Sequence, residues 1–190
     1  MKLLIILVTL TVLREADAQT SSTRLPTFED YPVKEIFHGA PHPPILVTPE
    51  QHRYRTRIRD GVEKGWGVST NGGEEQHKPG PNFAGHYVVI VWGCGAPCLM
   101  MAVVDAETGA VYNPPVSADG GLFLPLLGFP VSGSRNPDLA YRRDSQLMII
   151  KATPHWDRPG AQSYAFHFLL QNKQWKLLRR VSITDDLALK

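Results

Sequence analysis

Two apolar runs with little chain between them constrain this fold more than any other feature of the sequence. Residues 86–92 are rich in β-branched and aromatic side chains, and residues 99–104 are all apolar, as is typical of strands that are buried on both faces. Only residues 93–98 separate the two runs, whereas a parallel crossover needs about a dozen residues or more. The two runs therefore predict neighbouring antiparallel strands.

The rest of the second half repeats this arrangement of short strands and turns. In chain order, we expect a turn at 105–109 leading into a strand at 110–112, a hairpin of 139–142 with 146–152, and a hairpin of 164–170 with 175–181 through Asn172-Lys173. A long segment rich in proline and glycine, 113–133, separates the first unit from the second. The chain holds 16 glycines and 16 prolines, a surplus that favours turns over long helices. The predicted fold class is mainly β (α+β), an antiparallel sheet with one N-terminal helix.

That helix is expected over residues 49–64. Thr48 is a suitable N-cap, Pro49 suits the first helical position, and Gln51 completes a capping box. Gly65 is placed to end the helix. An apolar stripe with a spacing of four residues marks the buried face and comprises Tyr54, Ile58 and Val62.

The first eighteen residues have the organisation of a secretory signal peptide. Lys2 gives the positive start, residues 3–13 form a short apolar run, and Ala16 and Ala18 precede the expected cleavage before Gln19. The apolar run is shorter than the roughly 20 residues that a membrane-spanning helix needs. We therefore expect a secreted or periplasmic protein without stable membrane insertion after cleavage.

The mature chain has the length of one domain. We expect an extended N-terminal arm over 19–47, then a single β-rich domain over 48–184. The arm is expected to pack locally through Phe28, Tyr31, Ile36 and Phe37. Residues 66–79 are polar and rich in glycine, without periodicity, and are expected to form an inserted, poorly ordered loop.

Cys94 and Cys98 are the only cysteines, and both lie in the exported part of the chain. In an oxidising compartment they predict a structural disulfide that closes a small loop. Two alternatives stay open, a redox-active pair and a copper site. The redox reading is disfavoured because thioredoxin-type motifs have two intervening residues and open a helix. The copper site would need further ligands such as Met100 and Met101, which are more simply core residues. No cofactor and no metal are expected.

Several motifs resemble a family of small exported bacterial proteins whose function is uncharacterised. The resemblance lies in GPNFAGHY at 80–87, WGCGxxC at 92–98, DAxTGxVY at 105–112 and YRxDSxL at 141–147. Upstream, FEDYP at 28–32 also fits. Members of that family pass directly from the helix into GPNFAGHY, which implies that residues 66–79 are an insertion in this chain.

The candidate functional residues are His86, Tyr87, Trp92, Arg142 and Asp144, taken from these motifs. No catalytic residue is assigned, because the sequence holds no nucleophile elbow, zinc-binding helix motif or phosphate-binding loop. A net charge of +2 is too balanced to favour nucleic acid as a partner.

We therefore expect a non-catalytic binding module with a protein partner in the envelope or outside the cell, inhibitor-like or immunity-like in one form. The alternative is a cell-envelope enzyme, or a thiol or metal protein, that uses His86 with Cys94 or Cys98. Eight residues of extended chain place His86 about 26 Å from Cys94, so the pair could meet only if the chain folded back at Gly93.

Overall fold

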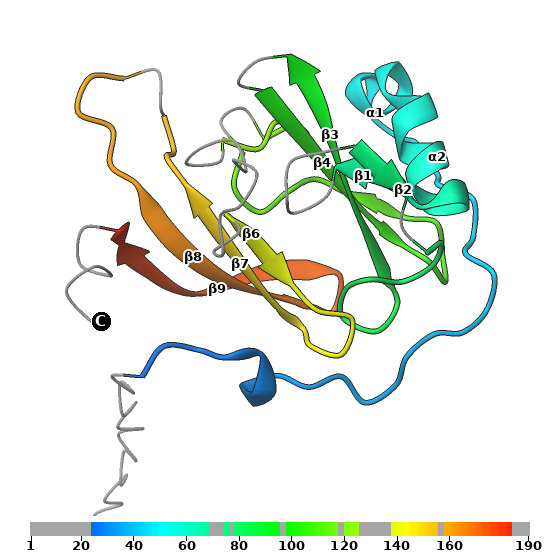
Figure 1. Ribbon diagram of the computed structural model, residues 1–190, viewed down its shortest axis with the longest axis horizontal. Coiled ribbons are helices and arrows are strands. Elements are labelled where there is room, and N and C mark those ends of the chain that lie inside the picture. The colour runs from blue at the N-terminus through cyan, green and yellow to red at the C-terminus, as the bar shows by residue number, and fades with distance from the viewer. Residues whose placement is uncertain are drawn as a thin grey trace, which may run out of the picture.

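Two antiparallel sheets dominate the structure, and the expected mainly β, α+β fold is confirmed (Figure 1). The computed structural model describes residues 24–68, 74–76, 78–95, 98–117, 120–125, 138–155 and 158–183. The first sheet has the order β3 (Tyr87–Gly95), β4 (Cys98–Asp105), β5 (Val111–Tyr112). The second has the order β6 (Leu139–Tyr141), β7 (Leu147–Ala152), β8 (Tyr164–Gln171), β9 (Gln174–Ser182). These strands thus divide between two sheets, whereas the sequence predicted a single sheet.

The main hydrophobic core lies between these sheets, because alternate residues of each strand face the opposite sheet. Val89 in β3 and Met101 in β4 pack in one cluster with Met148 in β7 and Phe166 in β8. The other faces of β3 and β4 are buried as well, in a second cluster formed with the helices. β3 and β4 are therefore strands buried on both faces, as their composition predicts.

The expected helix is present but divides into α1 (Pro49–Arg53) and α2 (Arg55–Lys64). The Thr48 side chain accepts a hydrogen bond from the Gln51 amide, which confirms the capping box, and Gly65 ends α2 in the left-handed conformation. Tyr54 leaves helical geometry between the two helices, and its ring packs against Trp92 with centroids 5.6 Å apart. The helix is therefore interrupted at Tyr54, where the side chain contacts β3. The sequence pattern does not predict this interruption.

The segment expected to be a loop, residues 66–79, contains two short strands. β1 (Trp66–Val68) pairs antiparallel with β2 (Glu74–Gln76), and β1 contacts α2 and β3. Residues 69–73 and 77 lie outside the described residues. The expectation of a wholly irregular loop was wrong for these strands, since three-residue strands are too short to show a periodicity in the sequence.

The N-terminal arm contacts distant parts of the chain, in addition to the local packing expected of it. After η1 (Phe28–Asp30), it passes in blue along one end of both sheets before it reaches α1 (Figure 1). Backbone hydrogen bonds fix it along this path: Val33 donates to Asp144, Phe37 to Gly85, and Ile45 to Gly109. The arm is therefore part of the domain, and it forms one wall of the cavity described below.

Candidate functional site

A cavity of about 770 Å³ lies where the arm crosses the beginning of β3. Arm residues 33–38 form one wall. The other walls come from Ala84, His86 and Tyr87, from Glu107 in the β4–β5 turn, from Gln146 before β7, and from residues 170–172 at the β8–β9 hairpin. The cavity has a volume typical of ligand-binding pockets. It exists only because the arm docks against the sheets.

The β4–β5 turn places Glu107 at this cavity. Asp105 is buried, and its carboxylate accepts hydrogen bonds from the Glu107 amide (2.9 Å) and from the Thr108 hydroxyl (2.8 Å). The Ala106 amide donates to the His86 carbonyl at 2.8 Å, which ties this turn to the start of β3. The DAxTG motif is thus accounted for by turn chemistry, and Glu107, at its variable position, is left facing the cavity.

The GPNFAGHY segment is also mostly occupied with the fold. The Asn82 amide donates to the Val89 carbonyl and accepts from the Val89 amide, and Phe83 is fully buried. Gly85 has a φ of +82°, and a Cβ there would collide with the backbone carbonyl oxygen of Glu35. His86 and Tyr87 are the residues of this segment whose polar side-chain groups make no hydrogen bond with the described residues.

His86 lines the cavity and is half-buried. Its ring packs on the ring of Tyr87, with centroids 4.1 Å apart. Within the described part of the chain, its side chain makes no hydrogen bond or ion pair. A neutral imidazole offers one donor and one acceptor, so His86 keeps both for a ligand.

Tyr87 is 4% exposed and also contributes to the cavity wall. Burial, and after it the charge of Asp105, raises the pKa of the Tyr87 hydroxyl well above its ordinary value of 10.0. The hydroxyl therefore stays protonated. It has no hydrogen-bond partner among the described residues, so it too can donate to or accept from a ligand.

Two carboxylates at the cavity also lack partners. Glu35 in the arm and Glu107 in the β4–β5 turn form no ion pair or side-chain hydrogen bond with any described residue. By contrast, the acidic groups around η1 are neutralised: Glu29 and Asp144 pair with Arg142, and Asp30 pairs with Arg24. The carboxylates at the cavity are thus unpaired, whereas those around η1 are paired.

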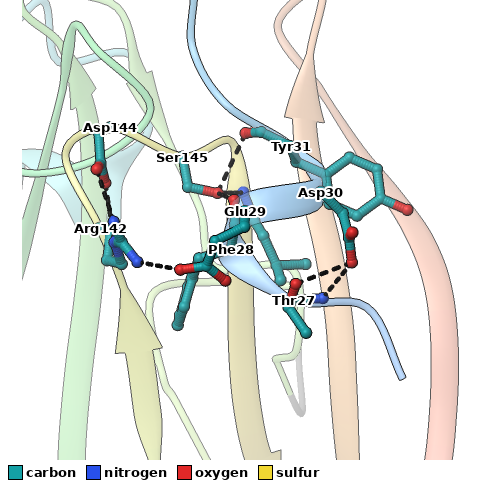
Figure 2. A network of polar contacts seen from close by, with 9 residues as sticks. Thr27, Phe28, Glu29, Asp30, Tyr31, Arg142, Asp144 and Ser145 are labelled. Atoms are coloured by element: carbon teal, nitrogen blue, oxygen red, sulfur yellow. Dashed lines mark hydrogen bonds and ion pairs between the residues drawn. The ribbon is translucent and has the colours of Figure 1, made fainter. Parts of the chain in front are cut away.

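Arg142 and Asp144, two of the candidates taken from the sequence, lie outside the cavity and hold the arm (Figure 2). Arg142 donates to both carboxylate oxygens of Asp144, at 2.9 and 2.7 Å, and to Glu29 at 2.6 Å. The Ser145 hydroxyl lies 2.8 Å from the Phe28 carbonyl oxygen and 3.1 Å from that of Tyr31. We call these contacts the arm-docking network; they account for the YRxDSxL and FEDYP motifs.

Trp92 lies in the helix-facing core and is 2% exposed. Its indole nitrogen is buried without a hydrogen-bond partner in the described part of the structure. Because the cavity borders the opposite end of β3, Trp92 does not contribute to it.

The two cysteines lie at the end of β3 and the start of β4, with a bulge in the register between Gly93 and Gly95. The side chain of Cys98 lies outside the described residues, so the bridge between the two stays a prediction. β3 runs on through Gly93 without folding back, and His86 therefore shares no site with Cys94.

Two further findings concern the described residues as a whole. No cluster of three or more His, Cys, Asp or Glu side chains among them has an arrangement that suits a metal ion. No helix among them is long and apolar enough to cross a membrane. Met100 and Met101, considered above as copper ligands, are buried in the two cores.

Comparison of the chain with protein-family models, with curated proteins and with solved structures finds no match.

Sequence reasoning identified His86 and Tyr87 but missed Glu35 and Glu107. Neither glutamate belongs to a periodic or motif position, and they come together only when the arm docks. The one local signal is Gly85 within GPNFAGHY, because a glycine before a buried strand indicates a close backbone approach. That signal does not reveal which segment approaches.

Proposed function

We propose that the mature chain is a non-catalytic binding module that acts outside the cytoplasm and engages a protein partner at the His86 cavity. The observation that supports this most is the set of unpartnered polar groups at one cavity: the His86 ring, the Tyr87 hydroxyl and the Glu35 and Glu107 carboxylates. Cavities with a few convergent polar groups are the usual form of binding sites. Hydrogen-bonding groups that the fold leaves open are available to a partner, and each new bond contributes about 0.5–1.5 kcal/mol net.

The location of that partner follows from the signal peptide. Cleavage before Gln19 leaves the whole arm, and so the complete cavity, in the mature protein. The partner is then a protein of the cell envelope or of the surroundings, and an inhibitor or immunity protein would act in this way. N-terminal sequencing of protein from the envelope fraction tests the location; an intact Met1 in exported material contradicts it.

The enzyme alternative receives less support from the geometry. It requires His86 close to a thiol, but the length of β3 separates His86 from Cys94 by about 26 Å. In the disulfide that we expect with Cys98, Cys94 would also have no free thiol to act as a nucleophile. The groups around His86 suit recognition, because they offer hydrogen bonds and charge without an activated nucleophile beside them.

The test uses mature protein, residues 19–190, immobilised and exposed to an envelope fraction. We expect specific capture of a partner protein, and its loss in a His86→Ala variant. His52→Ala is the matched control, since His52 is exposed on α1 and far from the cavity lining. Equal capture by the wild type and by both variants contradicts the proposal that the cavity is the binding site.

A further inference from the structure

The cavity carries more unpaired negative than positive charge. Glu35 and Glu107 contribute two carboxylates, whereas Lys34 is the only lysine or arginine among the described residues that line it. None of the three has an ion-pair partner within the described part of the chain. A ligand that carries a positive charge would therefore neutralise the excess negative charge of this site.

Two further features favour a planar cation over a compact one. Tyr87, 4% exposed, contributes to the cavity wall and has a protonated hydroxyl without a partner among the described residues, so it can accept one further hydrogen bond from a ligand. The His86 ring, which is tilted against the ring of Tyr87, and the Phe37 side chain in the cavity lining supply aromatic surface. A guanidinium has five donors in one plane and stacks on aromatic rings, whereas an ammonium is a point charge with three donors.

We propose that the cavity recognises an arginine side chain on an exposed segment of the partner protein. The guanidinium donates to Glu35, Glu107 and the Tyr87 hydroxyl, and Lys34 faces the backbone carbonyls of the partner segment. A volume of about 770 Å³ accommodates the arginine together with a flanking residue on each side. This inference rests on the proposed function, because it names the chemistry that the same cavity selects.

The test is an NMR titration of isotope-labelled mature protein with acetyl-Gly-Arg-Gly-amide. Its matched probes are the same peptide with citrulline, which keeps the shape of arginine and lacks the charge, and with glutamate. We expect the arginine peptide to shift the resonances of residues 34–38, 86–87 and 107, and the citrulline peptide to bind at least about tenfold more weakly. We expect the glutamate peptide not to bind.

Variants show which carboxylates contribute to binding of the arginine peptide. Glu107→Gln and Glu35→Gln each weaken binding of the arginine peptide about tenfold or more, because each removes one charge-assisted hydrogen bond and leaves the side-chain shape unchanged. Glu63→Gln is the control, since Glu63 is exposed on α2 and outside the cavity lining. It leaves the affinity unchanged.

The outcomes separate this inference from the proposed function. Equal binding of the arginine and citrulline peptides, or stronger binding of the glutamate peptide, overturns the inference but leaves a working pocket. No shift with the arginine peptide at 10 mM also overturns it, and the capture experiment with His86→Ala then decides the proposed function by itself. Shifts confined to residues outside the cavity contradict both.

Discussion

The carbonyl oxygen of Glu35 lies against the α-carbon of Gly85, so closely that any side chain at position 85 would collide with it. The Phe37 amide donates to the Gly85 carbonyl at 3.0 Å, which is a second contact between the same two segments. Gly85 therefore determines how near the arm comes to the start of β3. This approach places Glu35 beside His86 and forms the cavity.

Substitution of Gly85 by alanine should open this contact. The new methyl group meets the Glu35 carbonyl, and the φ of +82° is itself unfavourable for alanine by about 1–2 kcal/mol. We expect a clear loss of stability, faster hydrogen exchange of the Phe37 amide, and loss of partner binding. Denaturant unfolding and hydrogen exchange measure the first two.

Gly80→Ala is the control for this substitution. Gly80 also has a positive φ, +113°, but a Cβ there meets nothing within 4 Å. It should lose stability through backbone strain alone and retain both the protection of Phe37 and the binding of the partner. Identical behaviour of the two variants would show that the arm does not depend on its contact with Gly85.

Ser145 makes a second, separately testable contribution to arm docking. It is 1% exposed, its hydroxyl faces the arm carbonyls, and its oxygen accepts from the Leu147 amide at 3.2 Å. Ser145→Ala leaves buried groups without a partner and should destabilise the protein by about 1–3 kcal/mol. Thr56→Ala, at an exposed position of α2, should stay within about 0.5 kcal/mol of the wild type. A Ser145→Ala variant as stable as the wild type contradicts the account of docking.

Acid should loosen the arm. The Arg142 side chain holds the pKa of the Asp144 carboxyl below its ordinary 3.8, and a backbone hydrogen bond, followed by Arg142, lowers that of Glu29 below 4.5. Groups with lowered folded-state pKa values stabilise the fold above their unfolded values, and the contribution is lost as the pH falls through the folded values. The Val33 amide, which donates to the backbone carbonyl of Asp144, should thus lose protection below about pH 4.

The control for the pH experiment is Arg142→Gln, which removes the cation that both carboxylates share. In this variant the protection of Val33 should be lower at neutral pH and should change little between pH 6 and pH 3. A wild-type arm whose protection is constant over that range would contradict this role for the ion pairs.

The strands and turns could be predicted from the sequence because their signals are local. The apolar runs around 86–92 and 99–104 form β3 and β4, and Asn172 and Lys173 adopt the positive φ values, 50° and 64°, of a tight hairpin turn. The division into two sheets could not be predicted in this way, since the local sequence of a strand does not determine which other surface its sheet packs against. The break at Tyr54 and the β1–β2 pair also depend on contacts with the β3 layer.

Half of the candidate site could be predicted for the same reason. His86 and Tyr87 belong to one continuous motif, but Glu35 and Glu107 are brought to them by contacts far apart in the sequence. Arg142 and Asp144 stand out in the sequence as well, and the structure places them in the arm-docking network. A sequence motif thus indicates that its residues have specific contacts. Only the folded structure shows whether those contacts hold the arm or leave a polar group available for a ligand.

The cysteine pair should be independent of the cavity. We expect non-reducing mass spectrometry to find no free thiol, and a Cys94→Ser, Cys98→Ser double variant to lose only about 2 kcal/mol, because the closed loop is small. Partner binding should be unchanged, since these residues lie at the opposite end of β3 from His86. Alkylation of two thiols in native exported protein would support the redox and metal alternatives.

The most direct test of the account is the affinity of the captured partner for wild-type protein and for His86→Ala, measured by calorimetry alongside the free energy of unfolding of each. The His86 side chain makes no hydrogen bond within the described part of the protein, so its removal should change stability by less than about 1 kcal/mol. Affinity should fall at least about tenfold, the effect of one lost hydrogen bond of good geometry. Unchanged affinity together with a marked loss of stability would contradict the account, because it would make His86 a residue of the fold and not of the site.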